Sequence, residues 1–384
     1  MSIITIVLFF LVLGVLIFIH EFGHFVTAVK SGIKAEEFGF GFPPRLAGLV
    51  NDDTTGRWRV VFGDHEIISR KTVYSLNWIP FGGFVRMKGE DANSLTDQDS
   101  FAAKSAGTRI FVLAAGVAMN FLLAWVLVSG LYLFGFPQPV TEETRAQTND
   151  ISIKILAISQ GSPAEVIGMR PGDRLVSVDG IGLSTLNQAQ QLIADRKGSD
   201  IPMEIRRGNQ TLTLHGTPRI DAPAGEGALG ISFAEVGTVR YSWYQAPVKG
   251  AIATWNATMS IFSALGALLA GLFLGKGGAA DVTGPVGIVY VTKQMSELGI
   301  AYLIQFAAVL SINLAIFNIL PLPALDGGRI LFILIEKVKG SPVREVVEHR
   351  AHQIGFFLLL LAMIAVTVRD VSKFELLRKI VNLF

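Results

Sequence analysis

The chain has 384 residues, of which 51% are hydrophobic and 17% charged, so it is too apolar for an ordinary soluble enzyme and too interrupted to be all membrane. Its net charge of +2, with acids and bases interleaved, argues against nucleic-acid binding, and the lack of cysteine excludes disulfides and thiolate metal sites without fixing the redox compartment. We expect an integral membrane protein with at least one soluble module.

The first predicted element is an apolar helix near the N-terminus. Ile3 to Ile19 carry no charge, and with His20 the run approaches the roughly 20 residues that a membrane span requires. A cleaved signal peptide is the alternative, but no basic residue precedes the run and no small-x-small cleavage site follows it before His20. Because Lys30 and Lys34 come just after the span, we expect the N-terminus outside and the histidines toward the cytoplasm.

The span ends in the sequence HEFGH, an H-E-x-x-H pattern. His20 and His24 are four residues apart, so on a helix both imidazoles project from one face, about 6 Å apart along the axis, as two corners of a tetrahedral zinc site. Glu21 lies beside them as a base that would take a proton from water. The pattern alone is only moderately specific, but ionisable residues at membrane depth are costly and seldom lack a purpose. A third ligand should come from elsewhere in the chain.

Polar sequence with strand-like pieces follows the first span. These pieces are rich in β-branched and aromatic residues and are bounded by Gly, Pro and Asp: Arg57–Phe62, Lys71–Ile79 and Phe81–Met87. We predict a small β-structure against the cytoplasmic membrane face. The last run, FGGFVRM, with Gly82, Gly83 and Phe84, is a candidate for an exposed strand edge that holds an unwound substrate by strand addition. An ordinary amphipathic strand is the alternative.

A second apolar run, Ile110 to Gly135, follows Lys104 and Arg109, so it should lead from the cytoplasm to the exterior. From about Asn149 to Arg219 the composition is that of a soluble domain.

Within that domain we expect a helix that begins at Thr185, makes a capping box with Gln188 and ends near Gly198. Four strands surround it, the last two joined as a hairpin: Ile151–Ile158, Arg174–Gly180, Pro202–Arg207 and Thr211–Gly216. The run Gly161–Gly180 resembles the core of a PDZ domain, which would bind an extended peptide by strand addition. A scaffold module with an empty groove is the alternative.

Three apolar runs follow, Ala251–Leu274, Ala301–Leu320 and Gly355–Val368, and the last two look like spans. The candidate third ligand is Asp326, in the polar interruption NILPLPALDGGRIL between apolar runs. Pro321 and Pro323 free the carbonyls of Phe317 and Ile319, and unwound backbone at membrane depth is tolerated where it lines a cavity.

Gly327 and Gly328 would let a helix pack closely against the Asp326 carboxylate. A simple proline-kinked helix whose Asp326 faces water is the alternative. The other four histidines are expected to be solvated surface residues: His65, His215, His349 and His352.

Most of the chain resembles the site-2 protease family of intramembrane zinc metalloproteases, of the bacterial RseP type. The motifs that carry the resemblance are HEFGH, EFGFGFP (37–43), IPFGGFVRMKGE (79–90), AAGVAMNFLLA (114–124), the PDZ-like core, TGPVGI (283–288) and NILPLPALDGG. The resemblance implies that His20, His24 and Asp326 are Zn²⁺ ligands, that Glu21 is the catalytic base, and that Asn313 and Asn318 contact the substrate backbone. One departure is that the chain has room for a single PDZ module, whereas several relatives carry two.

The zinc site also predicts the topology. For Asp326 to meet the histidines, its apolar run must travel inward, so it must be the third span. Ala251–Leu274 should therefore lie along or dip into the outer interface, as Trp255 and Asn256 suggest. The basic residues of the following loop agree with this topology, but those of the C-terminal tail, then external, go against the charge rule.

The predicted fold is a polytopic α-helical membrane protein of about four transmembrane helices, with a cytoplasmic membrane-associated β-structure and one extracytoplasmic PDZ (α+β) domain. The predicted segments are a first span (1–34), a β-region (35–107), a second span (108–135), the PDZ domain (141–220), an interfacial or re-entrant region (221–300), a third span (301–335), a cytoplasmic loop (336–351), a fourth span (352–369) and a tail (370–384).

The predicted reaction is zinc-dependent hydrolysis of peptide bonds within transmembrane segments, in the bacterial inner membrane, with the active site toward the cytoplasm. The expected partners are the lipid bilayer, membrane-spanning substrates and a PDZ peptide ligand, without nucleic acid. The resemblance implies an anti-sigma factor already trimmed by another protease, or remnant signal peptides, with the PDZ module excluding untrimmed substrates by bulk. A non-catalytic PDZ scaffold and a metal transporter are the alternatives.

Overall fold

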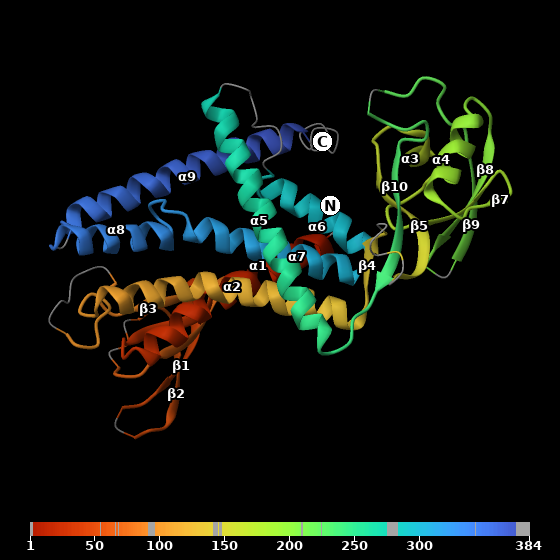
Figure 1. The fold of residues 1–384 in the computed structure, drawn as a ribbon. Helices are drawn as coiled ribbons and strands as arrows, with labels where there is room; N and C mark the ends of the chain where they lie inside the picture. The colour runs from red at the N-terminus through yellow and green to blue at the C-terminus, as the bar shows by residue number, and fades with distance from the viewer. Residues whose placement is uncertain are drawn as a thin grey trace, which may run out of the picture. The chain divides into compact units, whose positions relative to one another are not determined.

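The computed structural model describes residues 3–53, 55–65, 67, 69–90, 97–140, 145, 148–208, 210–223, 225–274, 283–341 and 343–373. Most of the predicted tail lies outside these residues. The chain divides into two compact units (Figure 1). The first unit comprises Met1–Val126, Ile252–Thr292 and Ala307–Phe384, and the second comprises Leu127–Ala251 and Lys293–Phe306.

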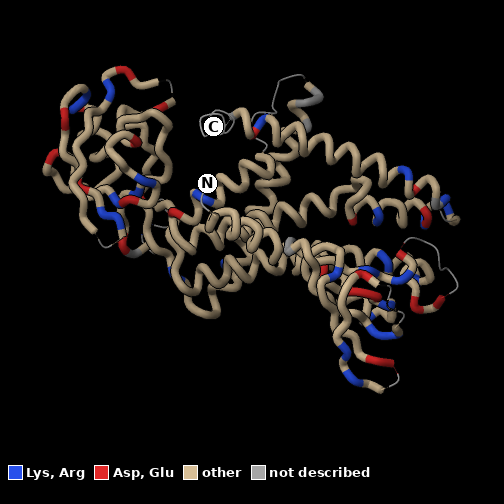
Figure 2. The backbone as a smooth tube through the Cα atoms, turned by 180° about the vertical axis from the view of Figure 1, so that it is seen from behind, with Lys and Arg blue, Asp and Glu red and all other residues tan. Residues whose placement is uncertain are grey.

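Five helices of the described chain are long and apolar enough to cross a membrane, which makes the protein a multi-pass membrane protein. They are α1 (Ile3–Lys30), α2 (Ala106–Phe134), α5 (Gln245–Phe273), α7 (Ile300–Ile319) and α9 (Glu345–Lys373). In Figure 2 the charged residues concentrate in the β-rich parts and near helix ends, and the middles of the long helices are nearly free of them. The sequence predicted about four spans; α5, predicted to be interfacial, has the length and composition of a fifth.

Contacts among α1, α2 and α7 give their relative directions within the first unit. His20 contacts Asn120 and His24 contacts Val112, so α1 and α2 run antiparallel. Ser311 of α7 donates a hydrogen bond to the carbonyl of Asn120 at 2.8 Å, and Asn318, two turns later, lies 3.4 Å from His20. Tyr302, near the start of α7, packs against Phe136, which follows the end of α2, so α7 runs antiparallel to α2 and in the same direction as α1.

A three-stranded sheet in the order β2-β1-β3 packs on α1 in the first unit. Its strands are β1 (Ala35–Asn51), β2 (Trp58–Phe62) and β3 (Val73–Met87). The two strands predicted on either side of Pro80 form the single strand β3, whose residues 83–87 pair with residues 35–40 of β1. Gly83 lies so close to α1 that a Cβ there would meet the Phe18 ring at 3.2 Å and the Gly39 carbonyl oxygen at 2.9 Å. Glycine therefore allows the strand to lie directly on the helix.

The second unit holds a seven-stranded sheet in the order β4-β10-β5-β6-β8-β9, with β7 paired to β6. Its elements are β4 (Phe136–Pro139), β5 (Thr148–Ile158), α3 (Pro163–Val166), β6 (Arg174–Val178), β7 (Ile181–Gly182), α4 (Leu186–Asp195), β8 (Ile201–Arg207), β9 (Gln210–Gly216) and β10 (Ile231–Val239). Thr185 caps α4 by accepting a hydrogen bond from the Gln188 backbone N–H. Strands β4 and β10 lie outside the predicted domain bounds of 141–220, so the sheet draws on more of the chain than expected.

The remaining helices are α6 (Pro285–Leu298) and α8 (Asp326–Lys339). Near the start of α6, the Gly287 N–H donates to the buried Asp370 carboxylate at 2.8 Å, which ties α6 to α9. The prolines end α7 at Ile319 as predicted, but the Phe317 carbonyl is not left free, because it accepts a hydrogen bond from the Leu320 N–H.

Candidate metal centre

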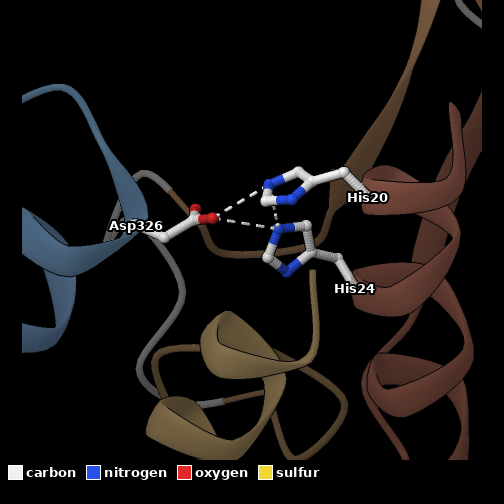
Figure 3. A group of neighbouring side chains, drawn as sticks. All are labelled: His20, His24 and Asp326. Atoms are coloured by element: carbon white, nitrogen blue, oxygen red, sulfur yellow. Dashed lines mark hydrogen bonds and ion pairs between the residues drawn. The ribbon is translucent and has the colours of Figure 1, made fainter. Parts of the chain in front are cut away.

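Three side chains from two distant segments converge in the first unit (Figure 3). His20 and His24 project from one face of α1, with their Nε2 atoms 3.1 Å apart. Asp326, the first residue of α8, places Oδ2 3.0 Å from His20 Nε2 and 3.3 Å from His24 Nε2. Both imidazoles are buried and the aspartate side chain is 17% exposed. The structure thus brings together the three residues that the sequence predicts as zinc ligands.

The donor set of this cluster fits a zinc ion. Asp326 Oδ2 is buried and has no hydrogen-bond donor among the described residues. Ligand atoms about 2.0 to 2.1 Å from a tetrahedral zinc are about 3.3 Å from one another, close to the three separations observed here. Since the facing atoms are two imidazole nitrogens and a carboxylate oxygen, a divalent cation would relieve the repulsion among their lone pairs.

The outer ring nitrogens of both histidines have partners, which sets the tautomers. His24 Nδ1 lies 2.9 Å from the Val112 carbonyl oxygen and must donate to it, so its Nε2 carries the free lone pair. His20 Nδ1 lies 3.2 Å from the amide of the fully buried Asn120, whose Oδ1 has no other partner in the described chain. With that amide turned so that Oδ1 accepts the Nδ1–H, His20 Nε2 is likewise free for a metal. Such partners orient the ligands.

Gly116 of α2 forms the floor beneath the two imidazoles. A Cβ at this position would lie 2.7 Å from His24 Cε1 and 2.8 Å from His20 Cε1, tighter than van der Waals contact allows. Only glycine lets α2 approach the histidines this closely.

We predict that Gly116→Ala lowers zinc affinity by about 10- to 100-fold, the range found when the groups that orient metal ligands are disturbed, with a matching loss of peptide hydrolysis. Gly130→Ala is the matched control, because Gly130 lies in the same helix with nothing within 4 Å of an added Cβ. Zinc affinity measured by competition with a chromogenic chelator checks both variants. Equal zinc affinities in the two variants would contradict the inference that the approach of α2 to the histidines requires glycine at position 116.

Glu21 lies beside the cluster and is held by the sheet. Its Oε2 accepts a hydrogen bond of 3.2 Å from the Val85 backbone N–H, near the C-terminal end of β3. The carboxylate is therefore fixed between the histidine face of α1 and the strand edge.

The loop that carries Asp326 is fixed by its own backbone and by α9. The sequence predicted that Gly327 and Gly328 let a helix pack closely against the Asp326 carboxylate. In the structure they make room for the loop instead, because an added Cβ would meet the carbonyl oxygens of Leu320 and Leu322. The prediction of a solvated surface residue is also wrong for His352, which is 20% exposed and whose Nδ1 accepts a hydrogen bond of 2.8 Å from the Ala324 N–H. Ala324 has a positive φ of 75°, an uncommon conformation for a residue with a Cβ, so this bond helps to hold the turn before Asp326.

The predicted substrate-binding residues are placed as follows. Asn318 Nδ2 lies 3.4 Å from His20 Nε2 at the edge of the cluster. Asn313 is half-buried on the same helix, five residues earlier. Gly82, Gly83 and Phe84 lie in β3 just before Val85, the residue that binds Glu21.

Sequence reasoning missed Asn120, Gly116 and His352 as parts of the site. The sequence does contain a signal for Gly116 and Asn120. The asparagine comes four residues after the glycine, so both lie on the same face of an otherwise apolar helix. No comparable signal existed for His352, since only the packing of α9 brings it to the loop.

Comparison with known proteins adds to this geometry. The family model described as Peptidase family M50 matches residues 8–63 and 57–362. A Clostridium perfringens protein named provisionally as a zinc metalloprotease is 33% identical over 363 residues, which cover 94% of this chain and 96% of the relative. The zinc metalloprotease RasP of Geobacillus kaustophilus is 29% identical over 97% of this chain and 99% of its own length. The regulator of sigma-W protease RasP of Bacillus subtilis is 27% identical over 96% and 98%.

Proposed function

We propose, from the premise that the chain belongs to peptidase family M50, that His20, His24 and Asp326 hold its zinc ion and that Glu21 is its catalytic base. The family and the relatives named RasP make the protein an intramembrane zinc metalloprotease of regulated intramembrane proteolysis. No finding favours the alternative of a non-catalytic scaffold. The observation that carries the residue assignment is the triangle of two Nε2 atoms and one carboxylate oxygen, with separations of 3.0 to 3.3 Å.

The residues around the cluster have separate roles in hydrolysis. When bound, zinc would polarise the scissile carbonyl and lower the pKa of water at the site toward 7. The Glu21 carboxylate, held by Val85, takes a proton from the attacking water and returns it to the leaving nitrogen. Val112 and Asn120 hold the imidazole rings in place through their Nδ1 atoms.

The assignment is tested with purified protein in proteoliposomes that contain a single-span substrate. We expect cleavage within the apolar span, its loss when a chelator removes zinc, and its return when zinc is added back, because the ligand set is complete within one chain. Mass spectrometry of the products locates the cleaved bond. Cleavage that persists after zinc has been removed to background would contradict the assignment.

A substrate helix hides its scissile carbonyls in its own hydrogen bonds, so it must be unwound before it is cleaved. We assign the holding of the unwound segment to the edge of β3 at Gly82, Gly83 and Phe84. Two observations support this assignment: β3 is an edge strand of its sheet, and its Val85 N–H bonds to the proposed base. A substrate strand added there would lie beside Glu21, and Asn313 and Asn318 would contact its backbone from α7.

Phe84→Pro disturbs this edge, because Phe84 pairs with Gly39 of β1 and proline cannot donate to the ladder, and we expect cleavage to fall by up to about tenfold. Val60→Pro, in the opposite edge strand β2, is the control and should leave cleavage nearly unchanged. Initial rates with the same reconstituted substrate, together with zinc content as a check of folding, compare the two variants. Unchanged cleavage in Phe84→Pro would contradict the assignment of substrate holding to this edge of β3.

The proposed membrane topology places the N-terminus and the seven-stranded sheet outside and the metal centre toward the cytoplasm, in a bacterial inner membrane. The common direction of α1 and α7 supports it, because an even number of crossings must then separate the end of α2 from the start of α7. The 14 residues of α6 are fewer than the roughly 20 needed to cross, so α5 does not cross either. A reporter fused after Gly275 that reads cytoplasmic would contradict this topology.

We also assign the seven-stranded sheet to a PDZ domain that binds a peptide or limits the size of substrates. Strand β4 pairs only with Val236–Val239 of β10, so in the described chain the preceding residues, Ile231–Ala234, have one strand neighbour, β5. Helix α4 contacts β10 and its Leu186 N–H binds the Glu235 carboxylate. An extended peptide could add to this edge. The substrate class that the family resemblance implies is membrane-anchored regulatory proteins such as an anti-sigma factor, and a relative named regulator of sigma-W protease supports it.

A further inference from the structure

Three neighbouring strands of the seven-stranded sheet carry a row of positive charges. Lys154 of β5 is directly opposite Arg174 of β6, and Arg174 is directly opposite Arg206 of β8. Directly opposed residues on antiparallel strands have Cβ atoms about 4.5 to 5.5 Å apart and project from the same face of the sheet. The adjacent register positions hold the core residues Ile153, Leu175 and Ile205. We call Lys154, Arg174 and Arg206 the basic row.

The basic row lines a cavity of about 780 Å³ within the second unit. Five basic and three acidic side chains line this cavity, and the buried acid Asp173 is already paired with Arg207 at 2.7 Å. Within the described residues, no carboxylate forms an ion pair with any member of the row. The cavity therefore contains cations whose charges the protein itself leaves unbalanced.

Such a row is unfavourable without an anion. Like charges directly opposite on neighbouring strands destabilise a sheet. Burial lowers the pKa of Lys154, and the positive charge of Arg174 lowers it further. A bound anion would remove this repulsion, and the forked guanidinium groups of Arg174 and Arg206 suit phosphate oxygens.

The position of the cavity in the second unit points to the source of the phosphate. Pro137, which lines the cavity, lies three residues after the end of α2 at Phe134. Glu297 and Leu298 also line it, and α7 begins at Ile300. Since α2 and α7 are both long and apolar enough to span the membrane, the cavity lies where two spans leave the hydrocarbon layer. Polar headgroups occupy the next ~5 to 7 Å on each side of that layer.

We propose that the basic row binds the phosphate of an anionic phospholipid headgroup. Clusters of basic residues beside membrane spans attract anionic lipid, and this one is in a cavity rather than on a flat surface. The bound headgroup would tie the seven-stranded sheet to the membrane surface next to the ends of α2 and α7.

The test uses the full chain in nanodiscs of phosphatidylcholine alone or of phosphatidylcholine with phosphatidylglycerol. An amine-acylating reagent is applied, and mass spectrometry gives the acylation rate of each lysine. We expect phosphatidylglycerol to slow acylation of Lys154 several-fold, because the bound phosphate covers the amine and keeps it protonated. Lys197, an exposed residue of the same unit that does not line the cavity, is the internal control and should react at the same rate in both nanodiscs.

Variants of the basic row test whether the protection of Lys154 depends on its arginines, and inorganic phosphate tests whether it depends on a lipid. Arg174→Gln and Arg206→Gln should abolish the protection of Lys154 by phosphatidylglycerol, whereas Arg196→Gln, on a residue outside the cavity, should keep it. Thermal unfolding shows that the variants fold, and removing a like charge should not lower their stability. Equal protection by inorganic phosphate in phosphatidylcholine nanodiscs would overturn the lipid headgroup in favour of a soluble phosphate. Lack of protection by phosphatidylglycerol, or protection that survives in both row variants, would overturn the site itself.

Discussion

Replacing Asp326 by Asn is expected to remove zinc from the purified protein and to reduce peptide hydrolysis to background. The carboxylate supplies the only anionic oxygen within 3.3 Å of both Nε2 atoms among the described residues. A neutral amide is a poor zinc ligand, and its NH₂ group could face the same two nitrogens. Zinc content measured by plasma mass spectrometry should fall from about one ion per chain to less than about a tenth of that.

The matched control for this change is Asp179→Asn, which removes a carboxylate paired with Arg196 in the second unit. It should retain zinc and cleavage. Asp326→Glu keeps the charge but moves it outward by one methylene, so an intermediate zinc affinity is expected. Full zinc content in Asp326→Asn, with helicity unchanged by circular dichroism, would exclude Asp326 as a ligand.

The predictable part of the site follows from local geometry. The spacing of His20 and His24 sets their common face because any α-helix brings residues four apart onto the same side. Asp326 was identifiable because a carboxylate between apolar runs needs a partner, and His20 and His24 were available. Asn120 and Gly116 depend instead on which face of α2 meets α1, and that choice is made by tertiary packing far along the chain.

The fold, too, was predictable where local sequence decides the structure and was not predictable where tertiary pairing does. Thr185 and Gln188 predicted the start of α4 because a cap acts within one turn. Two strands were expected around Pro80 because proline usually interrupts a ladder, whereas the structure carries one strand, β3, through it at the edge of the sheet. Strand β10 was missed because its pairing with β5 joins segments separated by the rest of the module.

Glu21→Gln is expected to lower the rate of cleavage by roughly 10²- to 10⁴-fold, the usual contribution of a general acid–base group. Glutamine has nearly the same shape, and its amide oxygen can still accept the hydrogen bond from the Val85 N–H. It cannot take a proton from water near neutral pH. Since Glu21 is not one of the three convergent residues, zinc content should stay at the wild-type value.

The separation of these two effects distinguishes the role of Glu21 from that of Asp326. Loss of cleavage with zinc retained identifies a proton carrier, whereas loss of both identifies a ligand. Glu36→Gln, a nearby glutamate in β1 instead of α1, should leave both quantities unchanged. If Glu21→Gln lost zinc as Asp326→Asn does, its carboxylate would belong to the metal's ligand set, and another group would have to move the proton. If it kept wild-type cleavage, the hydrogen bond to Val85 would be a structural link between α1 and β3 and nothing more.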